Sequence, residues 1–369
     1  MKLKRVLKWS LGAILLALFA AALVAYATST NDCGRLASAQ GERMKAIVYC
    51  DYGAPDVLRL ETIAKPACTD DQILIRVRAA AINPYEWHFM RGTPYIGRIM
   101  GMGLRKPKVT RLGADVAGRV EAVGRNVTGF KPGDAVFGSA PGALAEYACA
   151  SERRLLIKPG NVTFEQAASV PIAAITALQA LRDKGRLQPG QSVLINGASG
   201  GVGTFAVQIA KTLGAKVTGV CSTKNVEMVR SLGADQVVDY TKEDFTGSGQ
   251  RWDLIVDNVG NHSLLECRRA LTPRGRYVLV GGKNGRWIAP LDRALAAAVL
   301  SWFVSQDMGM MMAHLDNADL GVMRDLMQTG KVTPVIGRTY PLSQVSEAMR
   351  YLEAGHARGK VVITVSTEP

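Results

Sequence analysis

The sequence predicts an α/β fold with two domains: a β-barrel-like domain, then a doubly wound parallel sheet with helices on both faces. Several short strands separated by Gly and Pro turns follow Met44, which is typical of an antiparallel barrel. The apolar period changes near Phe164, and from Ser192 to Gly282 strands and helices alternate. We therefore expect the barrel-like domain at residues 44–168, the parallel-sheet domain at 169–311, and a C-terminal return to the first domain at 312–369.

Each domain is predicted from its own strands. The barrel-like domain has an alternating strand at Gln72–Ala80, which reads Q-I-L-I-R-V-R-A-A, and a turn at Lys131–Asp134. The last strand, Lys360–Val365, is expected to return to the sheet of this domain. The other expected strands are Lys45–Tyr49, Asp115–Val123, Ala135–Ser139 and Ala143–Ala150 in the first domain, and Val193–Ile195, Lys216–Val220, Gln236–Val238, Leu254–Asp257 and Tyr277–Val280 in the second.

A glycine-rich turn follows the first strand of the second domain. The stretch Val193–Gly203 reads V-L-I-N-G-A-S-G-G-V-G, and the residues after it, as far as Gly214, have the apolar spacing of a helix. Backbone N–H groups of such a turn, at the positive end of a helix, bind a pyrophosphate. Gly200 allows the ligand to approach the backbone, and Gly203 allows the helix to pack on the strand. The first glycine of the fingerprint is replaced by Ala198. We therefore predict dinucleotide binding by Ala198, Ser199, Gly200, Gly201, Val202 and Gly203.

The next strand predicts which dinucleotide binds. An NAD-binding sheet carries an acidic residue about 20 residues after the glycines, where it binds the ribose hydroxyls. This chain has Ser222, Thr223 and Lys224 at that place, which favour the 2′-phosphate of NADPH; the alternative is an ordinary solvated lysine at position 224. Further coenzyme contacts are expected from the ends of later strands, and from a tyrosine that flanks the adenine or packs in the core: Asn258, Val280, Gly281 and Tyr240.

Composition restricts the partners. The net charge is +14, but no basic run is interleaved with aromatic residues, so nucleic acid is not an expected partner. The charge indicates anionic ligands, a membrane surface or an ordinary basic surface. The six cysteines form no Cys-x-x-Cys pair and the four histidines are far apart in the sequence. This spacing predicts neither a zinc ribbon nor a dense disulfide framework.

The N-terminus resembles a membrane segment. Trp9–Ala27 is almost uninterruptedly apolar and follows a basic cluster, which favours an uncleaved anchor within residues 1–30. The alternative is a secretory signal cleaved near Ala27, which would give a secreted or periplasmic protein, because Ala25-Tyr26-Ala27 fits a small-x-small site. The basic flank places the folded body on the far side of the membrane, whereas a soluble coenzyme favours the cytosol, so the sidedness stays open. Residues 31–43 are a polar linker.

Several stretches of the folded body resemble the medium-chain dehydrogenase/reductase superfamily, in its zinc-free quinone-oxidoreductase branch. The matching stretches are Met44–Ala46, Ala81–Pro84, Gly113–Gly124, Phe130–Asp134, Ala167–Leu181, Val193–Gly203 and Gly359–Val362. The resemblance implies a GroES-like catalytic domain, a Rossmann domain and hydride transfer from NAD(P)H. Zinc-dependent relatives carry Cys where this chain has Asn83, and Gly-His-Glu where it has Gly113-Ala114-Asp115, so no catalytic zinc is expected.

Hydrogen-bond donors for the reacting oxygen are expected from the loop Asn83–His88 of the catalytic domain and from Tyr95. Asn83 matches the loop asparagine of the zinc-free branch, and His88 has a pKa suited to proton donation. Tyr95 follows Arg91-Gly92, as the catalytic tyrosine does in related enoyl-thioester reductases. The alternatives are loop capping by Asn83, an ordinary surface or core position for His88, and packing by Tyr95.

We therefore expect a zinc-independent, NADPH-dependent oxidoreductase that transfers hydride to a quinone or to the C=C bond of an α,β-unsaturated carbonyl. The expected substrate is small, electrophilic and lipophilic. The alternatives are an enoyl-thioester reductase and a non-catalytic NADPH-binding protein. The Trp- and Met-rich stretch Trp287–Met312 is interpreted as core or dimer packing, or as a hydrophobic wall that faces substrate or membrane. The resemblance implies a homodimer through this region.

Overall fold

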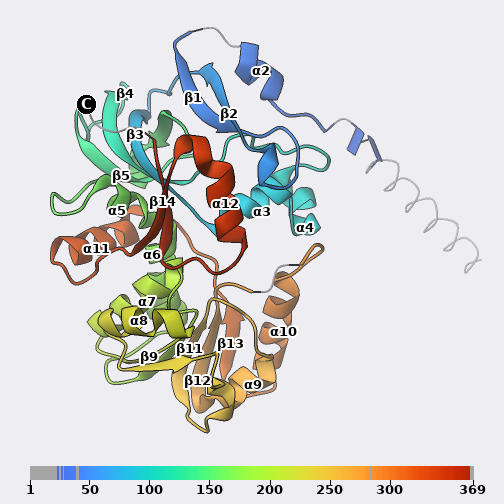
Figure 1. Ribbon diagram of the computed structural model, residues 1–369, viewed down its shortest axis with the longest axis vertical. Coiled ribbons are helices and arrows are strands. Elements are labelled where there is room, and N and C mark those ends of the chain that lie inside the picture. The colour runs from blue at the N-terminus through green and yellow to red at the C-terminus, as the bar shows by residue number, and fades with distance from the viewer. Residues whose placement is uncertain (1–22, 25, 28, 39–40, 283–284, 366–369) are drawn as a thin grey trace, which may run out of the picture.

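The computed structural model describes residues 23–24, 26–27, 29–38, 41–282 and 285–365, which form two domains stacked along the long axis of the molecule (Figure 1). Within these residues, no helix combines the length and the apolar character that a membrane crossing requires. The predicted anchor, residues 1–30, lies almost wholly outside the described residues.

The first domain is built on a seven-stranded sheet. In β3 (Gln72–Ile82) the side chains of Ile73, Ile75 and Val77 are buried while Arg76 between them is exposed, as the alternating pattern requires. The strand expected at Ala143–Ala150 begins later, because the residues before Tyr147 face β1 instead: the Ile47 N–H donates to the carbonyl of Leu144. The strand order is β14 (Ile336–Pro341), β15 (Lys360–Thr364), β3 (Gln72–Ile82), β4 (Asp115–Val123), β5 (Ala135–Ser139) and β7 (Leu155–Ile157), with β6 (Tyr147–Ser151) also beside β3 and a separate pair of β1 (Arg43–Val48) and β2 (Arg59–Ala64).

The second domain is a six-stranded parallel sheet with helices on both faces, which confirms the predicted Rossmann fold. The order of the strands reverses between β8 (Ser192–Asn196) and β11 (Trp252–Asp257), and in such sheets ligands bind at that switch point, outside the carboxyl ends of the strands. The strand order is β10 (Gln236–Asp239), β9 (Lys216–Cys221), β8 (Ser192–Asn196), β11 (Trp252–Asp257), β12 (Leu271–Leu279) and β13 (Asp307–Met310); the helices include α6 (Pro171–Gln179), α7 (Gly201–Thr212), α8 (Val226–Ser231), α9 (Leu264–Arg269) and α10 (Leu291–Ser301).

The C-terminal segment connects the two domains. After α11 (Asn317–Gln328) and α12 (Val345–Glu353), β15 pairs antiparallel with β3 of the first domain, with Val361 opposite Ile82. Just before this strand, the Gly359 N–H donates to the carbonyl of Ser199 in the glycine-rich turn at 2.8 Å. The last strand therefore touches the predicted coenzyme site and the catalytic domain at once.

The Trp- and Met-rich stretch forms α10 and the edge strand β13. Met308 and Met311 are buried, but Trp302, Phe303 and Met312 are 81%, 79% and 80% exposed. The interpretation as core packing is therefore wrong for these three side chains.

Two disulfides fasten the outer parts of the first domain. Cys33 in α2 (Cys33–Ser38) bonds to Cys50, and Cys68 bonds to Cys149. The paired residues are 17 and 81 positions apart, so their proximity is set by tertiary structure. Among the described cysteines, Cys221 and Cys267 are free and buried.

Candidate coenzyme site and active site

The glycine-rich turn has the geometry expected of a pyrophosphate cradle. Gly200 is the N-cap of α7, and a Cβ on it would meet nothing closer than 3.5 Å, so this face is open to a ligand. A Cβ on Gly203 would lie 2.1 Å from the carbonyl oxygen of Gly197 and 2.7 Å from the backbone of Ala198. Glycine at position 203 is therefore what allows α7 to pack against the turn.

The carboxyl end of β9 brings Ser222 and Ser199 together. Asn225, buried at this end, donates from Nδ2 to the hydroxyls of both serines at 3.2 Å. Lys224 is exposed beside them. Thr223 is turned away, because its hydroxyl donates to the Asp239 carboxylate at 2.6 Å. Ser199, Ser222 and Lys224 therefore lie together at this end of β9, whereas Thr223 is hydrogen-bonded to the carboxylate of Asp239.

Two further side chains surround this end of the site. Tyr240 is 52% exposed, so it does not pack in the core, and its ring is accessible to a ligand. Arg358 comes from the segment before β15, and its Nε donates to the thioether of Met228 on α8 at 3.0 Å. Sequence reasoning missed Arg358, because 130 residues separate it from Met228.

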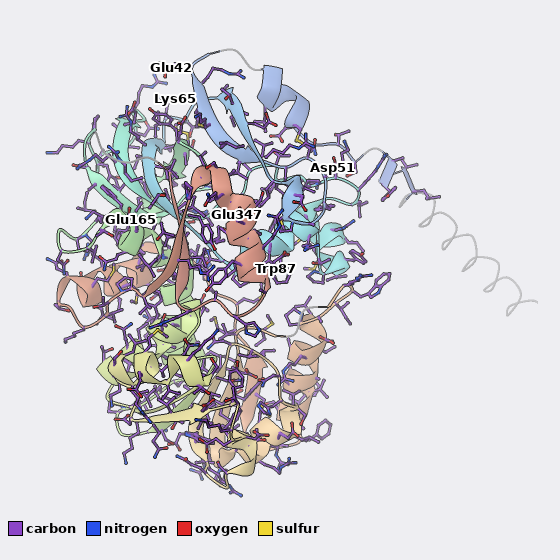
Figure 2. All side chains as sticks on the ribbon, in the orientation of Figure 1. Glu42, Asp51, Lys65, Trp87, Glu165 and Glu347 are labelled. Atoms are coloured by element: carbon purple, nitrogen blue, oxygen red, sulfur yellow. A yellow bond between two sulfur atoms is a disulfide. The ribbon has the colours of Figure 1, made fainter. Side chains whose placement is uncertain are left out.

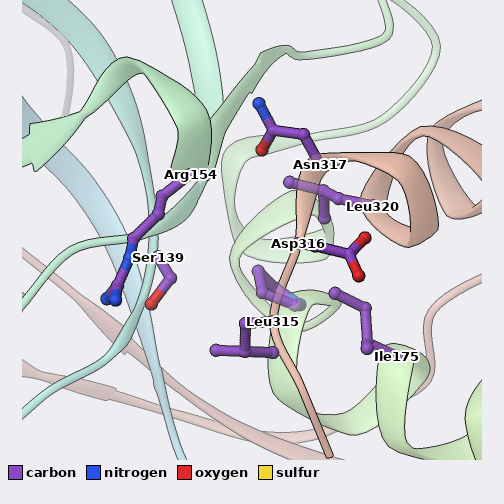
Figure 3. Close-up of a pocket in the computed structure, with 8 residues that line it drawn as sticks. Ser139, Arg154, Ile175, Leu315, Asp316, Asn317 and Leu320 are labelled. Carbon is purple, nitrogen blue, oxygen red and sulfur yellow. The ribbon is translucent and has the colours of Figure 1, made fainter.

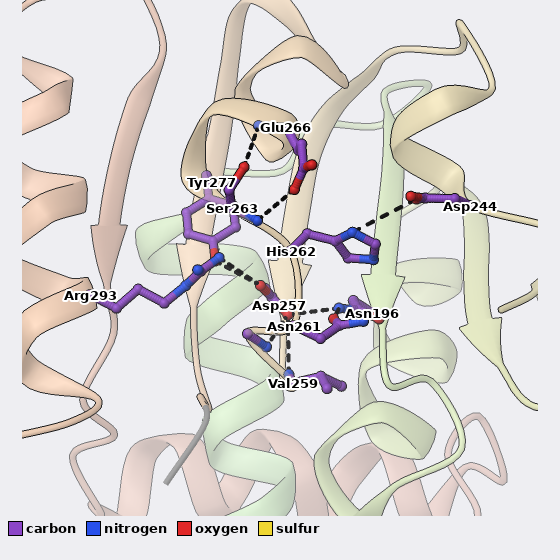
Figure 4. A network of polar contacts seen from close by, with 11 residues as sticks. Asn196, Asp244, Asp257, Val259, Asn261, His262, Ser263, Glu266, Tyr277 and Arg293 are labelled. Atoms are coloured by element: carbon purple, nitrogen blue, oxygen red, sulfur yellow. Dashed lines mark hydrogen bonds and ion pairs between the residues drawn. The ribbon is translucent and has the colours of Figure 1, made fainter. Parts of the chain in front are cut away.

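A buried polar network shapes the opposite end of the site (Figure 4). Asp257, 1% exposed, accepts from Asn196 Nδ2 at 2.9 Å and from the Tyr277 hydroxyl at 2.7 Å. It also accepts the backbone N–H groups of Val259 and Gly260 at 3.1 and 2.8 Å. Because one carboxylate accepts all four donors, the turn after β11 is held in one conformation. Sequence reasoning did not predict this network, because its members come from different strands.

That turn brings three predicted coenzyme residues together. Asn258 donates from Nδ2 to the carbonyl of Asn196 at 2.9 Å, and the Val280 N–H donates to the carbonyl of Asp257 at 2.9 Å. A Cβ on Gly281 would lie 2.4 Å from the Asn258 carbonyl oxygen, so glycine is needed there. Two buried oxygens, Oδ1 of Asn225 and Oδ1 of Asn258, have no hydrogen-bond partner within the described chain. Unsatisfied acceptors at two strand ends fit a ligand with ribose hydroxyl donors.

Asn83 lies at the end of β3, before α3 (Pro84–Arg91), and is 4% exposed. Its amide donates from Nδ2 to Asp115 at 3.0 Å and accepts a hydrogen bond from the Lys360 ammonium. Asn83 is also the N-cap residue of α3, as the capping alternative expected. The structure thus places Asn83 in a buried polar cluster with Asp115 and Lys360, which sequence reasoning did not connect.

Glu86 joins this cluster from the first turn of α3. Its Oε2 accepts the Asn83 N–H at 2.7 Å, whereas its buried Oε1 has no hydrogen-bond partner among the residues described. Burial, and then the nearby Asp115 carboxylate, raise the pKa of Glu86 to about 8. Burial also raises the pKa of Asp115, while the Lys360 ammonium and the Asn83 amide oppose that shift.

His88 stacks on Trp87 with 3.8 Å between ring centroids; Figure 2 labels Trp87 on the side of the catalytic domain that faces the Rossmann domain. His88 Nδ1 lies 2.8 Å from the carbonyl of Thr93, so this nitrogen carries the proton and donates. Burial lowers the pKa of His88, and the Thr93 carbonyl opposes this. The neutral ring therefore presents Nε2 as an acceptor.

Tyr95 lies where the two domains meet. Its N–H donates to the carbonyl of Arg286 at 2.7 Å, and its ring packs edge-on against Trp287 at 5.2 Å. The Arg98 guanidinium lies 4.8 Å from the ring centroid. This is a cation–π contact with the ring, and together with Trp287 it fixes the orientation of the Tyr95 side chain.

A very small cleft, with a cavity volume of about 10 Å³ and partly open to solvent, is lined by residues of both domains (Figure 3). Its wall combines apolar side chains with the Arg154 guanidinium. Ser139 in this wall is paired with Asp115 across β4 and β5, so the cleft adjoins the buried cluster. The lining residues are Ser139, Arg154, Pro171, Ile175, Leu315, Asp316, Asn317 and Leu320.

Comparison with known proteins identifies the family. Residues 69–160 match the family described as alcohol dehydrogenase GroES-like domain, and residues 232–363 match the family described as zinc-binding dehydrogenase. The 2-methylene-furan-3-one reductase of Solanum lycopersicum is 36% identical over 335 residues, which cover 87% of this chain and 79% of the relative. The chain belongs to the medium-chain dehydrogenase/reductase superfamily.

Other members of the superfamily agree with this assignment. The chloroplastic NADPH-dependent alkenal/one oxidoreductase of Arabidopsis thaliana is 35% identical over 338 residues, covering 87% of this chain and 80% of that protein. The solved quinone oxidoreductase of Coxiella burnetii superposes with a TM-score of 0.79 at 31% identity, covering 88% of this chain and all of the other. This member of the superfamily is therefore an oxidoreductase, as the resemblance implied. Within the described residues, no three His, Cys, Asp or Glu side chains converge as a metal site would require.

Proposed function

We propose that the protein is a metal-independent, NADPH-dependent oxidoreductase that reduces quinones or the C=C bond of α,β-unsaturated carbonyls. The observation that carries the coenzyme choice is the carboxyl end of β9, where Lys224 and Ser222 stand in place of an acidic residue. The acceptor class is supported by the relatives, which are named as a furanone reductase, an alkenal/one oxidoreductase and a quinone oxidoreductase.

Each part of the site has a role in this reaction. The glycine-rich turn binds the pyrophosphate, and Lys224 and Ser222 bind the 2′-phosphate. The turn held by Asp257 positions the nicotinamide half through Asn258, Val280 and Gly281. When bound, NADPH supplies a hydride. Tyr95 stabilises the oxygen charge that develops on the acceptor and supplies a proton, and His88 orients the acceptor from the side of α3.

Turnover tests this proposal. NADPH oxidation by the full-length chain should depend on an added quinone or enone. The H88A/Y95F variant lacks the Tyr95 hydroxyl, which acts on the reacting oxygen, and the His88 ring, which orients the acceptor, so it should lose about 100-fold in kcat. Its affinity for NADPH should stay within about threefold of the wild type, because neither group touches the coenzyme phosphates.

A matched control is Tyr85→Phe, which removes a half-exposed phenol hydroxyl from α3, the helix that carries His88, and should keep full turnover. Full kcat in the H88A/Y95F variant would show that other donors act. Activity confined to CoA or acyl-carrier thioesters would favour the enoyl-thioester reductase. Binding of NADPH without acceptor-dependent oxidation would favour a non-catalytic binding protein.

We further propose that the N-terminal apolar run anchors the protein in a membrane. The chain after this run is fastened to the catalytic domain, since the Ser29 hydroxyl accepts the N–H groups of Arg105 and Lys106 at 3.3 and 3.4 Å. The two disulfides are typical of an oxidising compartment and, with the basic N-terminal flank, favour a body on the far side. The full-length chain should stay with membranes washed in alkaline carbonate; release into the wash would contradict anchoring.

A homodimer stays a prediction. It is supported by β13, which ends the six-stranded sheet, and by the exposed Trp302 and Phe303 that precede this strand. An edge strand with neighbouring apolar side chains is a surface that a second copy could cover.

A further inference from the structure

The side chain of Lys360 is buried between the two domains. Only 3% of the residue is exposed, and its ammonium donates to Oδ1 of Asn83 and lies 3.4 Å from the carboxylate of Asp115. Asp115 is fully buried and also accepts the amide of Asn83 and, at 3.0 Å, the N–H of Ile172 at the start of α6. One ion pair thus contacts β15, β4, the start of α3 and the start of α6.

Lys360 also lies against the glycine-rich turn. Its neighbour Gly359 donates its N–H to the Ser199 carbonyl at 2.8 Å. The Cδ of Lys360 is 3.1 Å from the position that a Cβ of Gly201 would take. The aliphatic part of the side chain therefore packs on the first turn of α7, while its ammonium reaches the residue that begins α3.

A buried ion pair contributes little net stability, because the loss of hydration offsets the attraction between the charges. It does fix the geometry of its partners, since each hydrogen bond that is broken leaves a buried charge unsatisfied. Here the hydrogen-bond partners are Asn83, which precedes the helix of His88, and the N–H of Ile172. The glycine-rich turn is in contact with the aliphatic part of the Lys360 side chain.

We propose that Lys360 is a positioning residue, which couples the coenzyme-binding turn to Asn83 and α3 so that the acceptor side of the site is oriented when NADPH binds. This inference rests on the proposed function for its effect on turnover. The coupling itself does not depend on turnover, because it links coenzyme binding to the order of α3.

The test is hydrogen exchange of the full-length chain with and without NADPH, read at residues 84–91. Removing one charge alone would leave the other unpaired, so the informative variant is D115N/K360M, in which both charges are replaced by neutral side chains of similar size. The control is Lys158→Met, because the Lys158 ammonium donates to the carbonyls of Pro159 and Val162 and not to the coenzyme turn.

In the wild type and in the Lys158→Met variant, saturating NADPH should slow exchange at residues 84–91 about tenfold. In D115N/K360M, NADPH should still bind, but this protection should be lost and kcat should fall about tenfold, measured below the unfolding midpoint of each variant. Protection that persists in D115N/K360M, or protection absent from the NADPH-bound wild type, would overturn the proposal. If the wild type shows protection but no turnover with any acceptor, the proposed function fails and the coupling stands.

Discussion

Replacing Gly203 with alanine is expected to weaken NADPH binding by about 100-fold or more. The added Cβ would lie 2.1 Å from the Gly197 carbonyl oxygen and 2.7 Å from the Ala198 backbone, neither of which can rotate away. The start of α7 must therefore move, which displaces the N–H groups that face the pyrophosphate. Overpacking of this kind costs about 1–3 kcal/mol, and about 2.7 kcal/mol corresponds to 100-fold in affinity. Isothermal titration with NADPH measures the loss.

Gly247→Ala is the matched control, because a Cβ on Gly247 in the same domain would meet nothing within 4 Å. Its affinity for NADPH should equal that of the wild type. Wild-type affinity in Gly203→Ala would mean that the turn before α7 does not hold the coenzyme.

Replacing Lys224 with alanine should weaken NADPH binding by about 10- to 100-fold and leave NADH binding nearly unchanged. Lys224 is exposed at the carboxyl end of β9, beside Ser222 and Ser199. A charge-assisted hydrogen bond contributes about 1.5–3 kcal/mol, which sets the size of the expected loss. NADH lacks the 2′-phosphate, so it loses nothing when the cation is removed.

Lys242→Ala tests whether the effect belongs to this cation alone. Lys242 is another exposed lysine of the same domain, 3.5 Å from the Asp239 carboxylate. Its removal should change the affinity for either coenzyme by less than about twofold, because surface charges are screened. Equal losses of NADPH and NADH affinity in Lys224→Ala would refute the 2′-phosphate assignment.

The parts of the fold that the sequence predicted are those that depend on local patterns. β4 and β5 have the predicted bounds, because each strand is an apolar run with a Gly- or Pro-containing turn at both ends. The glycine-rich turn is equally local, since its strand, turn and helix are contiguous. The local sequence of such a strand–turn–helix unit is therefore enough to predict its conformation.

The parts that sequence reasoning missed depend on contacts between distant residues. Lys360 meets Asn83 across 277 positions, and Tyr277 meets Asp257 across 20, in the next strand of the sheet. The disulfide partners Cys68 and Cys149 are brought together only when β6 pairs with β3. The exposure of Trp302 and Phe303 also contradicts hydropathy, which predicts burial for both.

The central claim is that this protein oxidises NADPH with a quinone or an enone and needs no metal for it. The most direct measurement is acceptor-dependent NADPH oxidation before and after exhaustive treatment with a chelator. We expect the same rate in both samples, and a rate with NADPH well above that with NADH at equal concentration. A rate abolished by the chelator and restored by zinc, or no oxidation of NADPH with any acceptor, would contradict the account.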